Sequence, residues 1–256
     1  MDEILRDRVV LVSGGTQGVG AGIARAVVEE GGSVVVSGRT IGCGTELVDA
    51  LGDRATFVQA DVGDVDQARR TVAETIERHG RIDSLVNAAG LTSRGTLLDT
   101  TPELFDAHVA VNLRAPFFLM QAAVADMVAR GSGGTIVNVI TMTSHGGQPY
   151  LAPYAAAKAG LAALTRNAAH AHRWDRVRIN GLNIGWTETE REDAVQREFH
   201  GAGDDWLEKA AASQPMGKLG QVDEIAAMVA FLLSDRSGVV TGSVIDWDQV
   251  VPGAYD

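Results

Sequence analysis

The sequence VVLVSGGTQGVG occupies residues 9–20. Its first four residues form a short apolar run, which is typical of a strand buried in a parallel sheet. The glycine-rich turn of residues 13–20 follows, and residues 21–30 continue with a helical pattern. In the order strand, turn and helix, such glycines let the backbone approach a pyrophosphate, and the first helical N–H groups supply donors. The stretch therefore predicts a dinucleotide-binding unit; a glycine-rich turn without a ligand is the alternative.

The same alternation of apolar runs and helical patterns continues along the chain. Further strands are predicted at 33–37, 56–61, 82–87, 135–141, 176–184 and 239–246, and helices at 43–51, 64–80, 102–129, 152–171 and 222–233. This order predicts an α/β fold: a single doubly wound Rossmann-type parallel sheet of about seven strands, with helices on both faces. We expect one domain over residues 1–256, with a mobile flap of short helices at about 187–212, where the sequence is charged and weakly periodic.

Composition narrows the classes of protein. The chain has 256 residues, 45% of them hydrophobic, which suffices for one sizeable core. A net charge of -11 and the lack of a basic cluster argue against nucleic acid as a partner. No run reaches 18 apolar residues, the opening Met1-Asp2-Glu3 is acidic, and Cys43 is the single cysteine. We therefore expect no membrane span, no signal peptide, no internal disulfide and a reducing, cytoplasmic location.

A tyrosine and a lysine lie one helical turn apart at the start of the run 152–171. Tyr154 and Lys158 are four residues apart, so they share a helix face. A neighbouring ammonium favours the phenolate, so the pair predicts a lowered Tyr154 pKa and a general acid/base. A surface Tyr and Lys on an ordinary helix is the alternative, and the rest of the chain argues against it.

Two further features concern a helix centre and the ends of strands. Pro116 has no N–H for the carbonyl of Asn112, so the helix 102–129 should be irregular there, either to hold a water or to fit the core. The second strand runs into Gly38-Arg39-Thr40 without a carboxylate, and this favours NADP through Arg39, with NAD as the alternative. Asp61 either accepts from an adenine amino group or caps the next helix.

Together these residues resemble the short-chain dehydrogenase/reductase family in its single-domain form of about 250 residues. The motif Ser13-Gly14-x-x-x-Gly18-Val19-Gly20 is similar to its cofactor turn, and Asn87-Ala-Ala-Gly90 to its structural strand motif. Asn112, Tyr154 and Lys158 fall at its catalytic positions. The cofactor-binding residues expected from the turn, the strand ends and the resemblance are Gly14, Thr16, Gln17, Gly18, Val19, Gly20, Arg39, Asp61, Val62, Asn87, Ala88, Gly90, Tyr154, Lys158, Ile184, Thr187 and Thr189.

The resemblance implies a mechanism. A hydride passes between the nicotinamide and a substrate carbon while Tyr154 passes the proton. Lys158 lowers the Tyr154 pKa and binds the ribose hydroxyls, and Asn112 anchors a water chain that leads to Lys158. The fourth catalytic position, usually a Ser, holds Thr141, which keeps the hydroxyl and adds a methyl group.

Two departures from the family pattern concern the end of the chain. Ile184-Gly185 stands where the family commonly has Pro-Gly, and the backbone of Ile184 can still meet the carboxamide. Asp246-Trp-Asp-Gln stands where the family usually has Asp-Gly-Gly, close to subunit contacts. The resemblance implies a homotetramer, with a homodimer as the alternative.

The substrate is indicated only by polar and aromatic residues near the expected cleft. These are Arg94, His145, Gln148, Trp186 and Trp206, and they suggest a polar, hydroxylated small molecule such as a sugar or polyol. His170 and His172 face different sides of a helix and lack further ligands at suitable spacing, so no metal is expected.

We therefore expect an NAD(P)-dependent oxidoreductase that interconverts a secondary alcohol and a ketone. One alternative is a 3-oxoacyl thioester reductase, against which the acidic flap argues, because an acidic carrier protein needs basic residues near the pocket mouth. The other is a catalytically weak nucleotide-binding regulatory protein. Thr141 motivates it, whereas the intact set of Asn112, Tyr154 and Lys158 argues against it.

Overall fold

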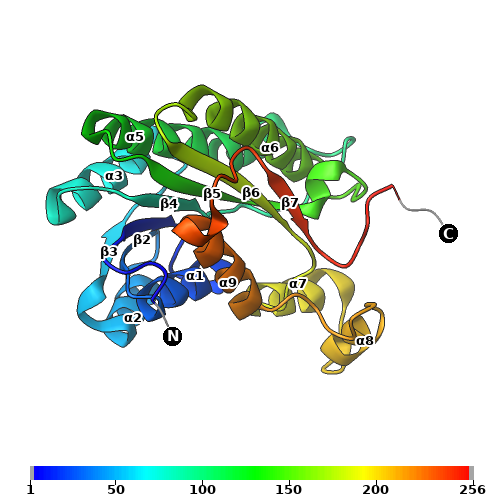
Figure 1. The fold of residues 1–256 in the computed structure, drawn as a ribbon. Coiled ribbons are helices and arrows are strands. Elements are labelled where there is room, and N and C mark those ends of the chain that lie inside the picture. Colours follow the sequence, from blue (N-terminus) through cyan, green and yellow to red (C-terminus); the bar gives the residue numbers. More distant parts are fainter. Residues whose placement is uncertain (1–2, 254–256) are drawn as a thin grey trace.

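The computed structural model describes residues 3–253 and shows a parallel sheet between layers of helices (Figure 1). Met1 and Asp2, which enter the expectation about the chain's start, lie outside the described residues. The strands are β1 (Val9–Ser13), β2 (Ser33–Gly38), β3 (Ala55–Gln59), β4 (Ser84–Asn87), β5 (Gly134–Thr141), β6 (Val177–Ile184) and β7 (Val244–Trp247). The helices are α1 (Gly18–Glu29), α2 (Ile41–Leu51), α3 (Val65–His79), α4 (Pro102–Val109), α5 (Ala115–Arg130), α6 (Ala152–His172), α7 (Glu190–His200), α8 (Trp206–Ala212) and α9 (Val222–Leu233).

The seven strands pair in the order β3-β2-β1-β4-β5-β6-β7, and every pairing is parallel. The order of strands reverses between β1 and β4, so the predicted doubly wound fold is confirmed. Ligands of such sheets bind beyond the carboxyl ends of the strands at this switch point. The glycine turn, which follows β1, lies at this switch point.

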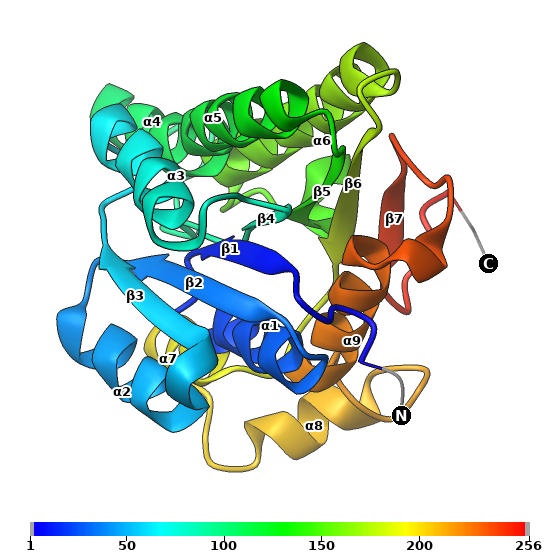
Figure 2. The ribbon, with the colours of Figure 1, turned by 60° about the vertical axis from the view of Figure 1, so that its left-hand side comes forward.

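Continuous apolar strands explain why both faces of the sheet are covered. In β1, Val10 and Val12 contribute to the core shared with α1 and α9, whereas Leu11 faces the core shared with α3 and α5. All three are fully buried. Figures 1 and 2 show these two helical layers on opposite sides of the sheet. Strands that are buried on both faces read as unbroken apolar runs, as the sequence does here.

Three strands differ from their predicted bounds by two residues or more, because apolar runs extend past the ladder. β7 begins at Val244 rather than at 239, since Val239 is 94% exposed and the preceding turn is held by side chains, including Thr241 Oγ1 accepting from the Ile179 N–H. β4 begins at Ser84, because the N–H of Ile82 donates to Asp126 instead of to a strand. β3 ends at Gln59, so Asp61 lies beyond the strand.

The segment predicted as a flap folds into two short helices, α7 and α8. Thr189 caps α7 by accepting from the N–H of Glu192, at 3.0 Å. Among the residues that the structure describes, none of those in α7 is fully buried. Trp206 of α8 is 8% exposed and packs with Ala210 and Leu219 in a small separate cluster. The flap therefore joins the main core only weakly.

Within residues 3–253, none of the helices combines the length and the apolar character that crossing a membrane requires.

Candidate active site

The glycine turn is shaped by two close backbone approaches. A Cβ on Gly14, whose φ is +73°, would lie 2.5 Å from the Cα of Ala89 after β4. A Cβ on Gly20 would lie 2.1 Å from the carbonyl oxygen of Gly14. Gly18, with φ of +51°, is exposed and has only a methyl group of Thr189 near its Cβ position, at 3.9 Å. Any side chain at Gly14 or Gly20 would therefore displace the backbone, while the surface at Gly18 stays open.

The amino end of α1 has the features of an anion site. Gln17 precedes the helix without capping it through its side chain, and the first turn of α1 carries no acidic residue. The first N–H groups of the helix thus have no side-chain acceptor, and the helix dipole favours a negative group beside them. The adjacent glycines leave room for a phosphate, so these residues fit the pyrophosphate of a dinucleotide.

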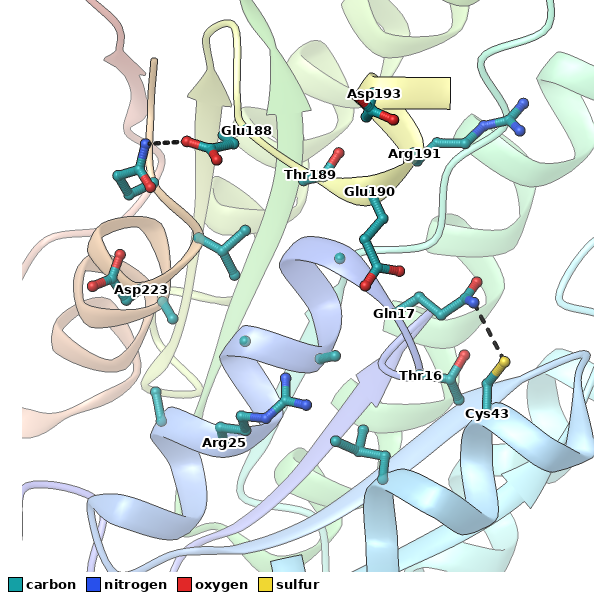
Figure 3. A pocket seen from close by; sticks show the side chains of 18 of the residues that line it. Thr16, Gln17, Arg25, Cys43, Glu188, Thr189, Glu190, Arg191, Asp193 and Asp223 are labelled. Carbon is teal, nitrogen blue, oxygen red and sulfur yellow. Dashed lines mark hydrogen bonds between the residues drawn. The ribbon is translucent and has the colours of Figure 1, made fainter. Parts of the chain in front are cut away.

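A groove of about 1480 Å³ reaches this turn from the side of α1. Figure 3 shows Thr16 and Gln17 at the turn, Cys43 of α2 below them, and Thr189 and Glu190 of the flap opposite. Gln17 Nε2 donates to Cys43 Sγ at 3.3 Å. Tyr154 and Lys158 do not line this groove. It opens beside the turn, while Tyr154 and Lys158 lie in α6, on the other layer of helices.

Tyr154 and Lys158 lie on one face of α6, as their spacing predicts. Lys158 is 3% exposed, and its Nζ is 5.9 Å from the centre of the Tyr154 ring. The ammonium donates to the carbonyl of Val139 in β5, at 2.8 Å. This is its only hydrogen bond within residues 3–253, so two of its three donors stay available for hydroxyl groups of a ligand.

The expected lowering of the Tyr154 pKa is wrong for the protein without a ligand. Burial raises the pKa of Tyr154 to about 12, and a hydrogen bond with Thr141 opposes the rise. Burial also lowers the pKa of Lys158 to about 8. The ammonium points to the Val139 carbonyl rather than to the phenol oxygen, so desolvation outweighs the attraction between the two groups.

Thr141 occupies the end of β5 and meets Tyr154. Its hydroxyl accepts from the N–H of Thr143 at 3.2 Å and donates to Thr143 Oγ1 at 3.3 Å. The same hydroxyl lies close enough to the phenol to oppose the rise in the Tyr154 pKa. Thr141 can therefore hold a substrate oxygen beside the phenol, as the usual Ser would.

Asn112 lies in a π-helical turn, Ala110–Arg114, that joins α4 and α5 and confirms the predicted irregularity. The residue is fully buried. Its Oδ1 accepts from the N–H of Leu91 and its Nδ2 donates to the carbonyl of Leu91, both at 2.9 Å. The side chain thus fastens the segment after β4, and the backbone carbonyl faces Pro116, which has no N–H to donate.

His108 is a site residue that the sequence reasoning missed. It is fully buried, and its ring centre is 6.2 Å from that of Tyr154. Nε2 donates to the carbonyl of Ser93 at 3.0 Å, and Nδ1 accepts from Asn112 Nδ2 at 3.1 Å. Burial lowers the pKa of His108, which keeps this neutral tautomer. The spacing of four residues between His108 and Asn112 was the available signal.

Other residues assigned to the cofactor lie near the turn and the strand ends. Arg39 is exposed, and within residues 3–253 its guanidinium makes no ion pair. The Asp61 carboxylate accepts from the N–H of Gly63 and does not cap α3, because Asp64 does so through the N–H groups of Asp66 and Gln67. Val62 packs in the core, and Asn87 Nδ2 donates to Asn138 across the sheet, with Asn87 Oδ1 left without a partner.

The residues assigned to the substrate do not form one cluster. His145 is 2.9 Å from Asp246 Oδ1 and contacts Asn183, on the β7 side. Trp206 donates to Asp193, and Trp186 donates to Glu192, so both indoles brace the flap. Gln148 is exposed in the loop before α6. Arg94 alone contacts both that loop and the flap, through Tyr150 and His200.

Comparison with known proteins places the chain. Residues 14–249 match the family model described as enoyl-(acyl carrier protein) reductase. An uncharacterized oxidoreductase of Thermotoga maritima is 34% identical over 94% of this chain and 96% of its own length. An L-rhamnose 1-dehydrogenase (NAD(P)(+)) of a Sphingomonas species is 31% identical over 95% of each chain. A solved short chain dehydrogenase/reductase family protein has a TM-score of 0.82 at 35% identity, over 95% of this chain and 96% of that one.

The fold and the site define an oxidoreductase with a dinucleotide-binding sheet. The chain belongs to the short-chain dehydrogenase/reductase family.

Proposed function

We propose that this protein is an NAD(P)-dependent oxidoreductase that interconverts a secondary alcohol and a ketone. The observation that carries the proposal is the buried ammonium of Lys158, 5.9 Å from the centre of the Tyr154 ring, with the Thr141 hydroxyl near the phenol. A phenol with a second hydroxyl beside it can transfer a proton to an oxygen held between them. A protein that only binds nucleotides has no need of this arrangement.

The chain's own residues have separate tasks in this chemistry. When bound, the nicotinamide supplies the hydride to the carbonyl carbon or accepts it from the alcohol carbon. Thr141 holds the substrate oxygen, and Tyr154 donates the proton in reduction and takes it in oxidation. Lys158 holds the ribose hydroxyls with its unused donors and, once drawn toward the phenol, stabilises the phenolate. Asn112 and His108 fix the segment of Leu91 and Ser93, and the His108 ring lies edge to face with the Tyr154 ring.

NADP is the proposed cofactor, with NAD as the alternative. Arg39 follows β2 directly, where an acidic residue would hold the 2′-hydroxyl of NAD, and its guanidinium has no carboxylate partner in the described chain. Replacing Arg39 with Ala should weaken NADP binding about tenfold or more and change NAD binding less than threefold, since only NADP carries the extra phosphate. Titration calorimetry with both cofactors measures this, and equal losses would remove the argument for NADP.

Thr141 gives a second test within the site. Replacing Thr141 with Val keeps the shape and removes the hydroxyl, so kcat should fall about 100-fold, whereas Ser should retain activity within a few-fold of the parent. Steady-state kinetics of the two variants makes the comparison. Full activity in the Val variant would show that the hydroxyl at this position does not hold the substrate.

The proposed substrate is a small hydroxylated molecule such as a sugar or polyol. The named activity of the rhamnose dehydrogenase relative supports this class. The alternative substrate is a 3-oxoacyl thioester on an acidic carrier protein, which would need a basic surface near the site. The first turn of α7 in the flap is instead acidic, with Glu190, Glu192 and Asp193. Nicotinamide absorbance with sugars, polyols, small ketones and acyl thioesters separates the two. Cofactor binding without turnover of any of these would favour the regulatory alternative.

Assembly as a homotetramer or homodimer is also proposed. Phe105 of α4 and Phe117 of α5 are 45% and 44% exposed, on the helices that carry the site. Apolar surface of this kind is typical of an interface between copies. Sedimentation velocity measures the mass in solution, and a monomer would contradict the proposal.

A further inference from the structure

We propose that Arg94 determines substrate specificity by fastening the carboxyl end of α7 beside the start of α6, which carries Tyr154, and thereby restricts the site to small substrates. The proposal concerns a contact of four residues, here named the latch: Arg94, Tyr150, Phe199 and His200. The effect on substrate preference rests on the proposed function, whereas the holding of α7 by these four residues rests on the structure alone.

The latch joins three segments that are distant in the sequence. The Arg94 guanidinium lies 4.5 Å from the centre of the Tyr150 ring and 4.4 Å from that of Phe199. Its Nη2 is 2.7 Å from His200 Nε2, which must accept because arginine only donates. Tyr150 and His200 also meet edge to face, with ring centres 6.4 Å apart. One side chain thus fastens the end of α7 to both loops.

The two loops that carry Arg94 and Tyr150 are joined to the elements that carry Tyr154 and His108. The N–H of Gly95 donates to the carbonyl of Tyr150 at 2.9 Å, and the N–H of Ala152 donates to the carbonyl of Gly95 at 3.0 Å. Ala152 begins α6, which carries Tyr154. On the other side of Arg94, the carbonyl of Ser93 accepts from His108, whose ring faces Tyr154. The position of Arg94 is therefore fixed relative to the reacting hydroxyl.

Apart from the latch, α7 is held at its first turn, where Trp186 donates to Glu192 and Trp206 donates to Asp193. None of its described residues is fully buried, and Phe199 itself is 47% exposed. The amino end of α7 lies beside the glycine turn, where Thr189 approaches Gly18 (Figure 3). The helix therefore spans from the glycine turn to the loops of Arg94 and Tyr150, and contacts at its two ends hold it. With the latch closed, we expect a long-chain substrate whose oxygen lies at Tyr154 to collide with the end of α7.

Two variants open the latch from opposite sides. Arg94→Ala removes the cation, and Phe199→Ala removes one ring from an exposed position, so at least the second should fold normally. Phe199→Tyr keeps the ring and should restore the parent behaviour. Arg173→Ala is the matched control, because Arg173 also stacks on a ring, that of Trp174, at 5.8 Å beyond the far end of α6.

Hydrogen–deuterium exchange of the α7 amides is the first readout, and it needs no turnover. Both latch variants should exchange about tenfold faster over residues 190–200, since each loses a cation–ring contact in a helix without buried anchors. The control and Phe199→Tyr should match the parent. Unchanged exchange in both latch variants would overturn the proposal.

The ratio of kcat/KM for a small ketone to that for a 3-oxoacyl N-acetylcysteamine thioester is the second readout. It should fall about tenfold in the same two variants, and faster exchange with an unchanged ratio would overturn the role in specificity. If neither substrate is turned over, the oxidoreductase proposal fails, while exchange still decides whether the latch holds α7.

Discussion

Replacing Tyr154 with Phe should lower kcat by about 10³-fold and leave cofactor affinity within about twofold of the parent. The substitution removes one oxygen, which contacts Thr141, and keeps the ring beside His108 and Lys158. In the proposed mechanism, turnover then lacks the group that passes the proton, whereas the proposed cofactor contacts of the glycine turn and Lys158 are retained. Steady-state kinetics and a fluorescence titration with reduced cofactor measure the two effects separately.

Tyr150→Phe is the matched control for this result. It removes the same oxygen from a tyrosine four residues earlier and keeps the ring that stacks on Arg94. Its kcat should change less than twofold. Unchanged turnover in the Tyr154 variant would show that another group carries the proton, and a parallel loss of cofactor binding would show that the phenol mainly binds.

Replacing Lys158 with Met should abolish turnover and yet stabilise the protein without cofactor at pH 7. Burial lowers the pKa of this lysine from 10.5 to about 8. At pH 7 the charged ammonium therefore has a higher free energy in the folded state than in the solvated, unfolded state. The shift corresponds to a cost on the order of 3 kcal/mol, from which the lost hydrogen bond to Val139 subtracts about 1 kcal/mol. Methionine fills the same space without charge.

The sign of the pH dependence follows from the same shift. Between about pH 8 and 10.5 the unfolded chain binds more protons at Lys158 than the folded chain does, so the parent gains stability as pH rises through this window. The advantage of the Met variant, about 2 kcal/mol at pH 7, should shrink toward zero by pH 10. Urea unfolding at both pH values tests this.

The control for the stability experiment is Lys209→Met. Lys209 forms an exposed pair with Asp205, its side chain being 74% exposed, so its loss should change stability by less than about 0.5 kcal/mol at either pH. A Lys158→Met variant that is less stable than the parent at pH 7 would contradict the prediction. It would mean that interactions in the folded chain offset the desolvation cost of the buried ammonium.

The sequence predicted the fold because its pattern is local. Strands buried on both faces give unbroken apolar runs, and the glycine turn at Gly14 and Gly20 is required by backbone contacts that a Cβ would prevent. Strand ends were less predictable. Val239 continues an apolar run but faces solvent, because hydrogen bonds with β6 and its neighbours, not hydrophobicity, decide where β7 begins.

The sequence predicted which residues form the site better than it predicted their pKa values and contacts. Spacing placed Tyr154 and Lys158 on one helix face and the family resemblance indicated Thr141, and the structure brings the three residues together. The Tyr154 pKa was predicted in the wrong direction, because spacing along a helix does not report burial or the acceptor that the ammonium meets. His108 and the latch depend on contacts between separate segments, Ser93 with α4 and Arg94 with the end of α7, which no local pattern contains.

The most direct test of the central claim follows the transferred hydrogen. Reduced cofactor that carries deuterium at nicotinamide C4, on one face or the other, is incubated with the protein and the ketone that it reduces fastest, and the product alcohol is examined by mass spectrometry and NMR. The account predicts that one of the two labelled forms, and not the other, delivers deuterium to the carbinol carbon of the product. The parent should form this labelled alcohol about 10³-fold faster than the Tyr154→Phe variant does. Product without deuterium on that carbon from either cofactor, or label arriving equally fast in the variant, would contradict hydride transfer with Tyr154 as the proton donor.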